Sequence, residues 1–476
     1  MDLVSLLEPG QFVVVTFLTL LLPVYVLFVL FVVRKGGKWG SRAGRRLVLG
    51  GLGALAVCAC VLYGVAAGLQ ALAALTSVMP ALLPFAVRVQ RVAFAAPQPA
   101  GYHRFNPAVV ALGGRRAHVA ALRESTLYNC AEAHHINVRS DNRVLVGAST
   151  TGPAGAYRLC TVYARPDLAA GSAHRGYQDG RLFPLGRARV AGGEVAARLG
   201  ITLAVYHSMH VGELAVRVDP AGTCHVAHLR EPVPVHLRGT PIGTKQKNWM
   251  HIPPMGDSNS NGNMSNDDYD DDNNVFDVFD ENGSGNEQRK QEHLKQEQQL
   301  PRFVQWINPL TVVALNTSTG EAEVVARAPH SAAFSDRLRG NTNFLRHPRE
   351  PHRLFALVHY RDESRALVVV PYYTSAVLEI REHPNGTYTL AGVSRHFRLP
   401  TADNATTAHR IHFPMSLAYA DASMHEIDIA MGYMDCTPHI VTVRTDDFIH
   451  AVESAAGDPP PIFPSRTRPF FRRKRS

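Results

Sequence analysis

The pattern of apolar and polar stretches separates the start of the chain from the rest. Two apolar runs without charged side chains open the chain, and the thirteen residues between them carry six positive charges and no negative charge. About 20 apolar residues span a bilayer as a helix, so the runs predict two transmembrane helices at about 11–33 and 47–69. A cleaved signal peptide would carry positive charge before its apolar run, whereas Asp2 and Glu8 precede this one. With an apolar stem, the spans make residues 1–89 a membrane anchor.

Beyond residue 100 the pattern changes to short segments of seven to nine residues, such as 144–150, 201–209 and 311–317. These segments are rich in Val, Ile, Leu, Tyr and Thr, and turns with Gly, Asn, Asp or Pro separate them, which is typical of β-strands. Amphipathic helical patterns are few. About 350 residues of this kind favour an all-β fold, a five-bladed β-propeller with four strands in each blade. A pair of β-sandwiches is the structural alternative.

One polar segment interrupts the strands. Residues 255–300 are rich in Asn, Asp, Gly, Ser and Gln, and such a composition cannot bury enough apolar surface to fold, so we expect a disordered insert. The insert divides the propeller into residues 100–254 and 301–450, and a basic disordered tail is expected at 451–476. The acidic run 270–272 lacks the glycine turn and the closing acidic residue of a calcium loop, so no metal site is expected.

Short loops rich in Lys and Arg stay on the cytoplasmic side of a membrane. The basic loop at 34–46 therefore places everything after the second span in the lumen, and we expect an integral membrane protein of the secretory pathway, in the Golgi or the endoplasmic reticulum. The bilayer is then one partner. The formal net charge of +9 does not indicate nucleic-acid binding, because most of this excess lies in the loop and in the luminal tail.

Two further patterns agree with a luminal domain. Five N-x-[ST] sequons, the acceptor sites of N-glycosylation, all follow the second span: Asn263, Asn282, Asn316, Asn385 and Asn404. Four cysteines also follow it: Cys130, Cys160, Cys224 and Cys436. Four cysteines allow three pairings, among which the sequence does not choose, and free thiols remain the alternative.

Six segments, in order, resemble motifs of the five-bladed propellers of carbohydrate-active enzymes, the β-mannoside phosphorylases and hydrolases, β-mannosyltransferases and related proteins of algae, protists and giant viruses. They are FNPAV with HVAALRES (105–125), QDGRLF (178–183), KNW (247–249), WINPLTVV (306–313), RGNTNF (339–344) and IHFPMSLAYAD with EIDIAMGYMDC (411–436). Together they span about residues 102–445. The chain departs from the family at Gln178 and Gly180, where the motif is E-D-P-R, and at Ser416, where the family has Gly.

The resemblance implies a sugar site at the central channel, with an acidic residue that exchanges a proton with a sugar oxygen and cations that hold phosphate. Asp179 occupies the acidic position and is the candidate catalytic residue; a structural salt bridge with Arg181 is the alternative. The candidate substrate-binding residues are Asn106, Arg123, Arg181, Asn248, Asn343, His359, Tyr360 and Asp435. No cofactor is expected.

The function expected from these features is a membrane-anchored, luminal glycan-processing enzyme. It would transfer or phosphorolyse a mannoside-like glycosyl group, and its partner would be an oligosaccharide or an activated sugar, either a sugar nucleotide or a sugar phosphate. The alternative is a non-catalytic propeller that binds glycans or proteins. Gln178 motivates this alternative, because the acidic neighbour of Asp179 is missing there.

Overall fold

The computed structural model describes part of the chain, all of it within the unit Pro80–Ser476. The described residues are 83, 86–112, 117–126, 140–164, 174–189, 195–205, 208–219, 221–240, 248–255, 275–277, 300–362, 372–402, 412–421, 423–433 and 437–453. Both predicted spans, most of the insert and the tail beyond 453 lie outside these ranges. Within them, no helix combines the length and apolar character needed to cross a bilayer.

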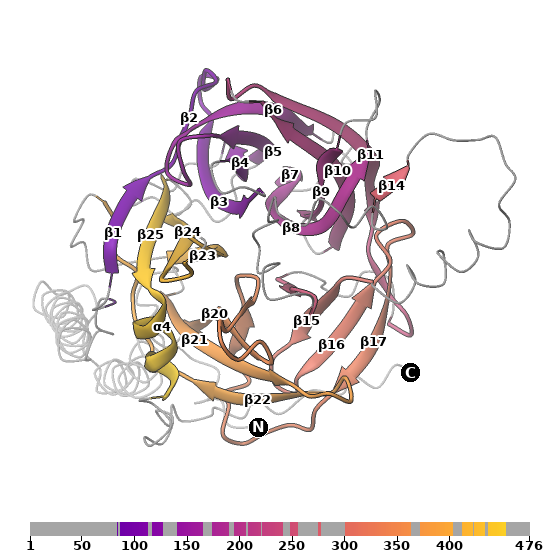
Figure 1. Ribbon diagram of the computed structural model, residues 1–476, viewed down its shortest axis with the longest axis vertical. Helices are drawn as coiled ribbons and strands as arrows, with labels where there is room; N and C mark the ends of the chain where they lie inside the picture. Colours follow the sequence, from indigo (N-terminus) through magenta and orange to yellow (C-terminus); the bar gives the residue numbers. More distant parts are fainter. Residues whose placement is uncertain are drawn as a thin grey trace, which may run out of the picture. The chain divides into compact units, whose positions relative to one another are not determined.

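Five antiparallel sheets stand around a common axis and form a five-bladed propeller (Figure 1). Blade 1 contains β3 (His103–Ala111), β4 (His118–Ser125), β5 (Ser140–Ser149) and β6 (Ala156–Ala164). Blade 2 contains β8 (Gln178–Arg189), β9 (Val195–Val205), β10 (Ser208–Val218) and β11 (Cys224–Pro234). Blade 3 contains β13 (Met250–Ile252), β15 (Arg302–Trp306), β16 (Thr311–Leu315) and β17 (Glu321–Arg327). The predicted fold class is confirmed for the propeller.

Blade 4 contains β18 (Leu338–Gly340), β19 (Leu345–Arg346), β20 (Arg353–Asp362), β21 (Tyr372–Glu382) and β22 (Tyr388–Val393). Blade 5 contains β23 (His412–Tyr419), β24 (Glu426–Tyr433) and β25 (Thr437–Arg444), followed by the helix α4 (Thr445–Glu453). Short strands pair in parallel with the main ones: β2 (Ala93–Phe94) with β6 and β12 (His236–Leu237) with β17 at sheet edges, and β7 (His174–Gly176) with the start of β5.

The N-terminal strand closes the ring. β1 (Ala86–Arg91) pairs antiparallel with β25 and forms the outer edge of blade 5, so the first and last strands of the propeller share one sheet (Figure 1). The propeller thus includes residues before position 100, where the sequence analysis began it. Just upstream, Leu83 is 4% exposed in the core between blades 4 and 5.

Five apolar clusters lie between the blades, one at each junction. Strands in the middle of a blade are buried on both faces, and β16 (TVVAL) is buried at every position. Outer strands alternate, as in β17 (EAEVVAR), where buried or partly buried residues alternate with exposed ones. This difference follows from the architecture, because a middle strand has a neighbouring blade on each side and an outer strand faces water. Helix α4 adds Phe448, Ile449 and Val452 to the cluster between blades 4 and 5.

Part of the insert has a described strand. β14 (Val275–Asp277) pairs in parallel with the last residues of β8. The rest of the insert lies outside the described residues, so its predicted disorder stays a prediction.

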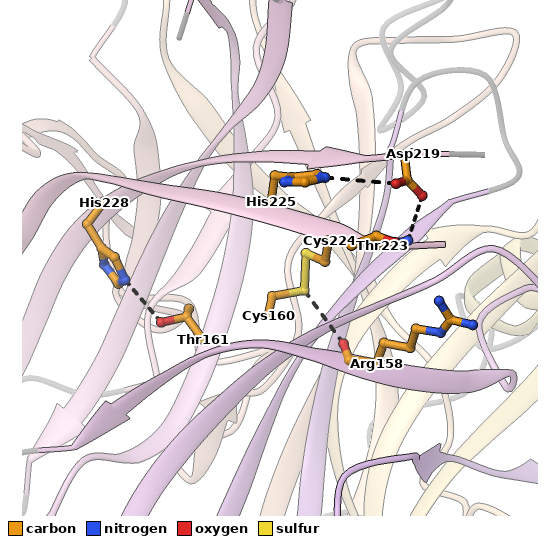
Figure 2. The surroundings of a disulfide bond; sticks show 8 residues. All are labelled: Arg158, Cys160, Thr161, Asp219, Thr223, Cys224, His225 and His228. Atoms are coloured by element: carbon orange, nitrogen blue, oxygen red, sulfur yellow. Dashed lines mark hydrogen bonds and ion pairs between the residues drawn. A yellow bond between two sulfur atoms is a disulfide. The ribbon is translucent and has the colours of Figure 1, made fainter. Parts of the chain in front are cut away.

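A disulfide joins the outer strands of blades 1 and 2. Cys160 in β6 and Cys224 in β11 are bonded, with Cα atoms 5.3 Å apart (Figure 2). Two hydrogen bonds reinforce the same junction: Thr161 Oγ1 lies 3.0 Å from His228 Nε2, and Arg158 donates to the carbonyl of Ala221 at 3.0 Å. Of the three pairings that the four cysteines allow, only the one with Cys160 bonded to Cys224 agrees with this bond. Cys130 and Cys436 lie outside the described residues.

Removing this disulfide is expected to destabilise the propeller. It closes a loop of 64 residues, and a loop of that length corresponds to about 4 kcal/mol of unfolding free energy in the chain-entropy account. The Cys160→Ser/Cys224→Ser variant should therefore unfold at a lower denaturant concentration than the wild type under non-reducing conditions. With reductant present the two proteins should unfold at the same concentration. Equal midpoints without reductant would contradict a stabilising bond.

Two of the five sequons lie in described hairpin turns. Asn316 follows β16 and is half-buried, whereas Asn385, between β21 and β22, is exposed. Each side-chain oxygen accepts from the backbone amide two residues on, at 2.9 Å for Asn316 and 3.1 Å for Asn385. Asn263, Asn282 and Asn404 lie outside the described residues.

Because Asn385 is the more accessible of the two, we expect it to carry a glycan if the propeller enters the secretory pathway. The Asn385→Gln variant of the full chain, expressed in a eukaryotic host, should lose the mass of one glycan relative to the wild type. Asn316→Gln is the matched control, with a smaller loss or none. A wild type whose mass does not change on enzymatic deglycosylation would contradict the luminal assignment.

Candidate active site at the mouth of the channel

A carboxylate and an amide from neighbouring blades meet where the inner strands begin. Asn106 in β3 donates through Nδ2 to Oδ1 of Asp179 in β8, at 2.9 Å. Both residues lie at bulges: the pairing of β3 with β4 shifts between Phe105 and Ala108, and that of β8 with β9 shifts between Gln178 and Gly180. A bulge redirects a side chain from the regular alternation of a strand. Local backbone irregularity therefore brings this pair together.

Asn106 also has a left-handed backbone, with φ of 53°, a conformation that Asn adopts more readily than most residues. Its side chain packs closely on blade 5. A Cβ atom at Gly432 in β24 would lie 1.7 Å from Oδ1 of Asn106, so only glycine fits at 432. Asn106 thus contacts both neighbours of its own blade, Gly432 in blade 5 and Asp179 in blade 2.

Arg123 brings a positive charge to the same carboxylate. It stands at the end of β4, 7% exposed, with Nη1 3.5 Å from Oδ1 of Asp179, whose side chain is 21% exposed. Its Nε and Nη2 both donate to Oδ1 of Asn142, at 3.0 and 2.7 Å, and its guanidinium lies 4.9 Å above the ring of Phe105. These contacts fix the guanidinium in one orientation and direct Nη1 toward Asp179.

A second cation continues the cluster into blade 3. Arg181 donates through Nη1 to the carbonyl of Trp249 at 3.1 Å and through Nη2 to Oδ1 of Asn248 at 3.3 Å. Burial lowers the pKa of Arg181 to about 10, and the charge of Asp179 opposes that shift. The guanidinium is therefore protonated at neutral pH, and the charge of Asp179 favours this form. The structural salt bridge named as the alternative role of Asp179 stays a prediction.

Asn248 adopts φ of 66° and lies against blade 4. A Cβ atom at Gly340 would be 2.4 Å from the carbonyl oxygen of Asn248, so this contact also needs glycine. Asn106, Arg123, Asp179, Arg181 and Asn248 form a continuous polar group, here called the mouth cluster.

Of the other predicted site residues, Asn343 and His359 lie at the junction between blades 4 and 5, whereas Tyr360 in β20 contacts the segment that leads into β18. Asn343 exchanges two hydrogen bonds of 2.9 Å with the backbone of Leu417. The ring of His359 lies 5.3 Å from Tyr373 and 5.5 Å from Phe413. The hydroxyl of Tyr360 accepts from Arg337 at 2.9 Å. Asp435 lies outside the described residues.

Farther along the inner strands the channel is narrow and mostly apolar. A cavity there has about 30 Å³ of free space and is lined by residues that include Val110, Leu182, His251, Asn343, Leu345 and Leu417. That volume holds a few water molecules, far less than a sugar ring. Among the described residues, sugar chemistry is therefore better placed at the mouth cluster than deeper in the channel.

The sequence analysis did not single out three residues that shape this region. Asn142 orients Arg123, and Gly432 admits Asn106. His251 lines the cavity between the rings of Phe183 and Phe303, whose centroids lie 5.0 and 5.4 Å away. Asn142 has no sequence signal, because its role depends on the pairing of β4 with β5. No group of three His, Cys, Asp or Glu residues that could hold a metal ion occurs in the described part of the chain.

No family model matches the chain, and no curated sequence does. Among solved structures, the chain is similar to a mannose phosphorylase from Leishmania mexicana (11% identity, TM-score 0.39, 77% of this chain and 91% of that one). A β-1,2-mannobiose phosphorylase from Listeria innocua shows 8% identity and a TM-score of 0.39 over 77% of this chain and 100% of that one. A GDP-Man-dependent mannosyltransferase from Leishmania mexicana shows 8% identity and a TM-score of 0.39, over 76% of this chain and 91% of that one. The fold assignment itself rests on the five sheets and their closure.

His251 is expected to make the protein sensitive to acid. Burial, with a smaller contribution from the charge of Arg346, lowers the pKa of His251 from 6.5 to about 3. Between these values the unfolded chain binds the proton and the folded chain does not, so stability falls as the pH drops below 6.5. From pH 6.5 to 5 this one group accounts for a loss of about 2 kcal/mol.

The test is the free energy of unfolding from pH 7 to 5 for wild type, His251→Gln and the exposed control His225→Gln. His251→Gln should show the shallower decline, and the control should follow the wild type. Parallel curves for all three proteins would refute the assigned burial effect.

Proposed function

We propose that this chain is a membrane-anchored, luminal glycan-processing enzyme that transfers a mannoside-like glycosyl group at the mouth of the propeller. The observation that carries the proposal is the convergence on Asp179 of Asn106 at 2.9 Å and Arg123 at 3.5 Å, both from the neighbouring blade 1, with Asn106 and Asp179 at bulged positions. A carboxylate that touches the solvent and is fixed by an amide and a guanidinium has the geometry of a positioned acid–base group.

The charges around Asp179 favour one direction of the reaction. The positive charges of Arg123 and Arg181 stabilise the carboxylate anion, so Asp179 suits the role of base better than that of acid. It would accept the proton of an acceptor hydroxyl as that oxygen attacks the anomeric carbon. The bond from the anomeric carbon to the phosphate oxygen of the donor breaks, and the phosphate leaves with the electron pair.

Such a leaving group is anionic, and the guanidinium charges close to Asp179 favour its binding. Transfer from an activated sugar, a sugar nucleotide or a sugar phosphate, therefore fits this site better than hydrolysis. The mannoside class comes from the sequence resemblance alone.

The anchor and the luminal location rest on the charge pattern of the N-terminal region. The Cys160–Cys224 bond supports them, because disulfides persist in oxidising compartments and are rare in the cytosol. A cytosolic location would leave that bond without an oxidising environment.

A donor screen tests the activity. The full chain, purified in detergent from a secretory host, is incubated with sugar nucleotides and sugar 1-phosphates plus mannoside acceptors. Asp179→Asn should lower kcat by about 100-fold or more, since positioned acid–base groups contribute 10²–10⁴-fold. Glu323→Gln, on the outer strand of blade 3 with a side chain 63% exposed, is the control and should match the wild type.

An unchanged rate in Asp179→Asn would remove this residue from the chemistry. The second candidate, a binding propeller without activity, is favoured by Gln178 in place of an acidic residue. A folded wild type that turns over no donor but binds glycans would establish that candidate.

A further inference from the structure

An exposed tryptophan is connected to the mouth cluster through Gly340 and Arg339. Trp306, at the end of β15, is 43% exposed. The guanidinium of Arg339, at the start of blade 4, lies 5.5 Å from the centroid of its ring. The other large exposed apolar side chains in the described ranges are Val87, Leu159, Val195, Met255 and Val325. Val87, Leu159, Val195 and Val325 lie on other strands and Met255 follows β13, so none of them shares a strand with Trp306.

The surroundings of Trp306 are held rigidly. Two residues on, Asn308 donates to the carbonyls of Ser331 and Phe334 at 2.9 and 2.8 Å and to Oδ1 of Asp336 at 3.1 Å. Its own side-chain oxygen accepts from the amide of Ser331 at 2.9 Å. This single side chain fixes the segment that leads into β18.

Arg339 is oriented by the same segment. Its Nη1 donates to the carbonyls of Asp336 and Leu338, at 2.6 and 2.9 Å. Its Nε and Nη2 have no hydrogen-bond partner among the described residues. A fixed guanidinium therefore offers donors beside an accessible indole. Here we call Trp306 and Arg339 the indole platform.

Contacts connect the indole platform to the proposed base. Arg339 precedes Gly340, which lies against the carbonyl of Asn248. Asn248 in turn accepts from Arg181 at 3.3 Å, and Arg181 interacts electrostatically with Asp179. The platform is thus the rim of the mouth cluster on the side of blades 3 and 4.

We propose that the indole platform is a distal subsite that binds a second or third sugar unit of the acceptor, so that the substrate is an oligosaccharide rather than a single sugar. The proposal rests on the proposed function. The face of an indole carries negative charge and attracts the polarised C–H groups on one face of a pyranose ring. The free N–H groups of Arg339 match neighbouring hydroxyl oxygens.

A protein partner fits these observations less well. Stable protein interfaces bury about 800 Å² on each partner, whereas no other large exposed apolar side chain in the described ranges shares a strand with Trp306. Its size matches a single sugar ring. The series of contacts that leads from the platform to Asp179 also gives a saccharide, but not a protein surface, a reason to extend across the rim.

The test compares acceptors of one to four sugar units with the full chain. For the wild type, KM should fall with chain length. Trp306→Ala should raise KM about ten-fold for the trisaccharide and leave kcat and the monosaccharide KM unchanged. Trp306→Tyr should restore most of the affinity, and Arg339→Ala should give a smaller change with the same dependence on length. Leu159→Ala, which removes an exposed side chain on blade 1, is the matched control.

The outcomes separate the two proposals. If the wild type turns over mannosides but Trp306→Ala keeps the wild-type dependence on chain length, the subsite is refuted and the enzyme stands. An equal loss for all acceptors would also refute a distal subsite. If no donor is used, calorimetric titration with the same saccharides replaces kinetics: a wild type that binds none of them refutes both proposals, and a ten-fold loss of trisaccharide affinity in Trp306→Ala supports the subsite without the activity.

Discussion

The pairing of β1 with β25 is the interaction on which the rest of the molecule depends. Each blade buries its faces only against its two neighbours, through the five apolar clusters at the junctions. Such a ring has no stable open form, because an open ring would leave two blade faces in water. The strand that closes it comes from the other end of the propeller, with Ala86 opposite Val443 and Arg91 opposite His439. Closure also brings blade 5 against blade 1, where Gly432 receives Asn106. Closure therefore completes the packing of Asn106, one member of the mouth cluster.

At the mouth of the channel, the polar residues are positioned by irregular backbone features: bulges, positive φ angles and glycines in close contact. Asn106 and Asp179 lie at bulges, Asn106 and Asn248 have positive φ, and two glycines make room for them. These irregularities cost stability locally, and the apolar junctions below them provide the rigid frame that maintains them. A few ångströms farther along the same strands the pattern returns to close-packed Leu and Val around a small cavity. The polar residues of the mouth cluster therefore lie at the end of the channel, and the apolar residues lie within it.

The sequence predicted the propeller because its strands are regular and numerous. Errors in the boundaries of single strands therefore did not change the predicted fold class. All five residues of the mouth cluster were candidates in the sequence analysis because the motifs contain each of them, and their part in binding or catalysis stays a prediction. The sequence analysis placed the start of the propeller too late because the apolar sequence of the stem continues into β1 without a break. An apolar residue such as Val87 is compatible with a stem and with a strand. Asn142 and Gly432 could not be found, because their roles depend on register and on contact across the closure. The pairing of Cys160 with Cys224 was equally hidden, since it depends on which outer strands become neighbours.

The narrow channel and the indole platform are two consequences of the same packing. Because Leu182, Leu345 and Leu417 are among the residues that line the small cavity at the axis, a chain of sugars bound at Asp179, as proposed, would have no room to continue inward. Its further units would extend over the rim. On that rim the polar contacts run from Arg181 through Asn248 to Gly340, toward blade 4, where Arg339 lies above Trp306. On the opposite side, Asn106 is packed tightly on Gly432. The packing therefore favours a path over blades 3 and 4 for an extended substrate, and the same apolar core that closes the ring determines that path.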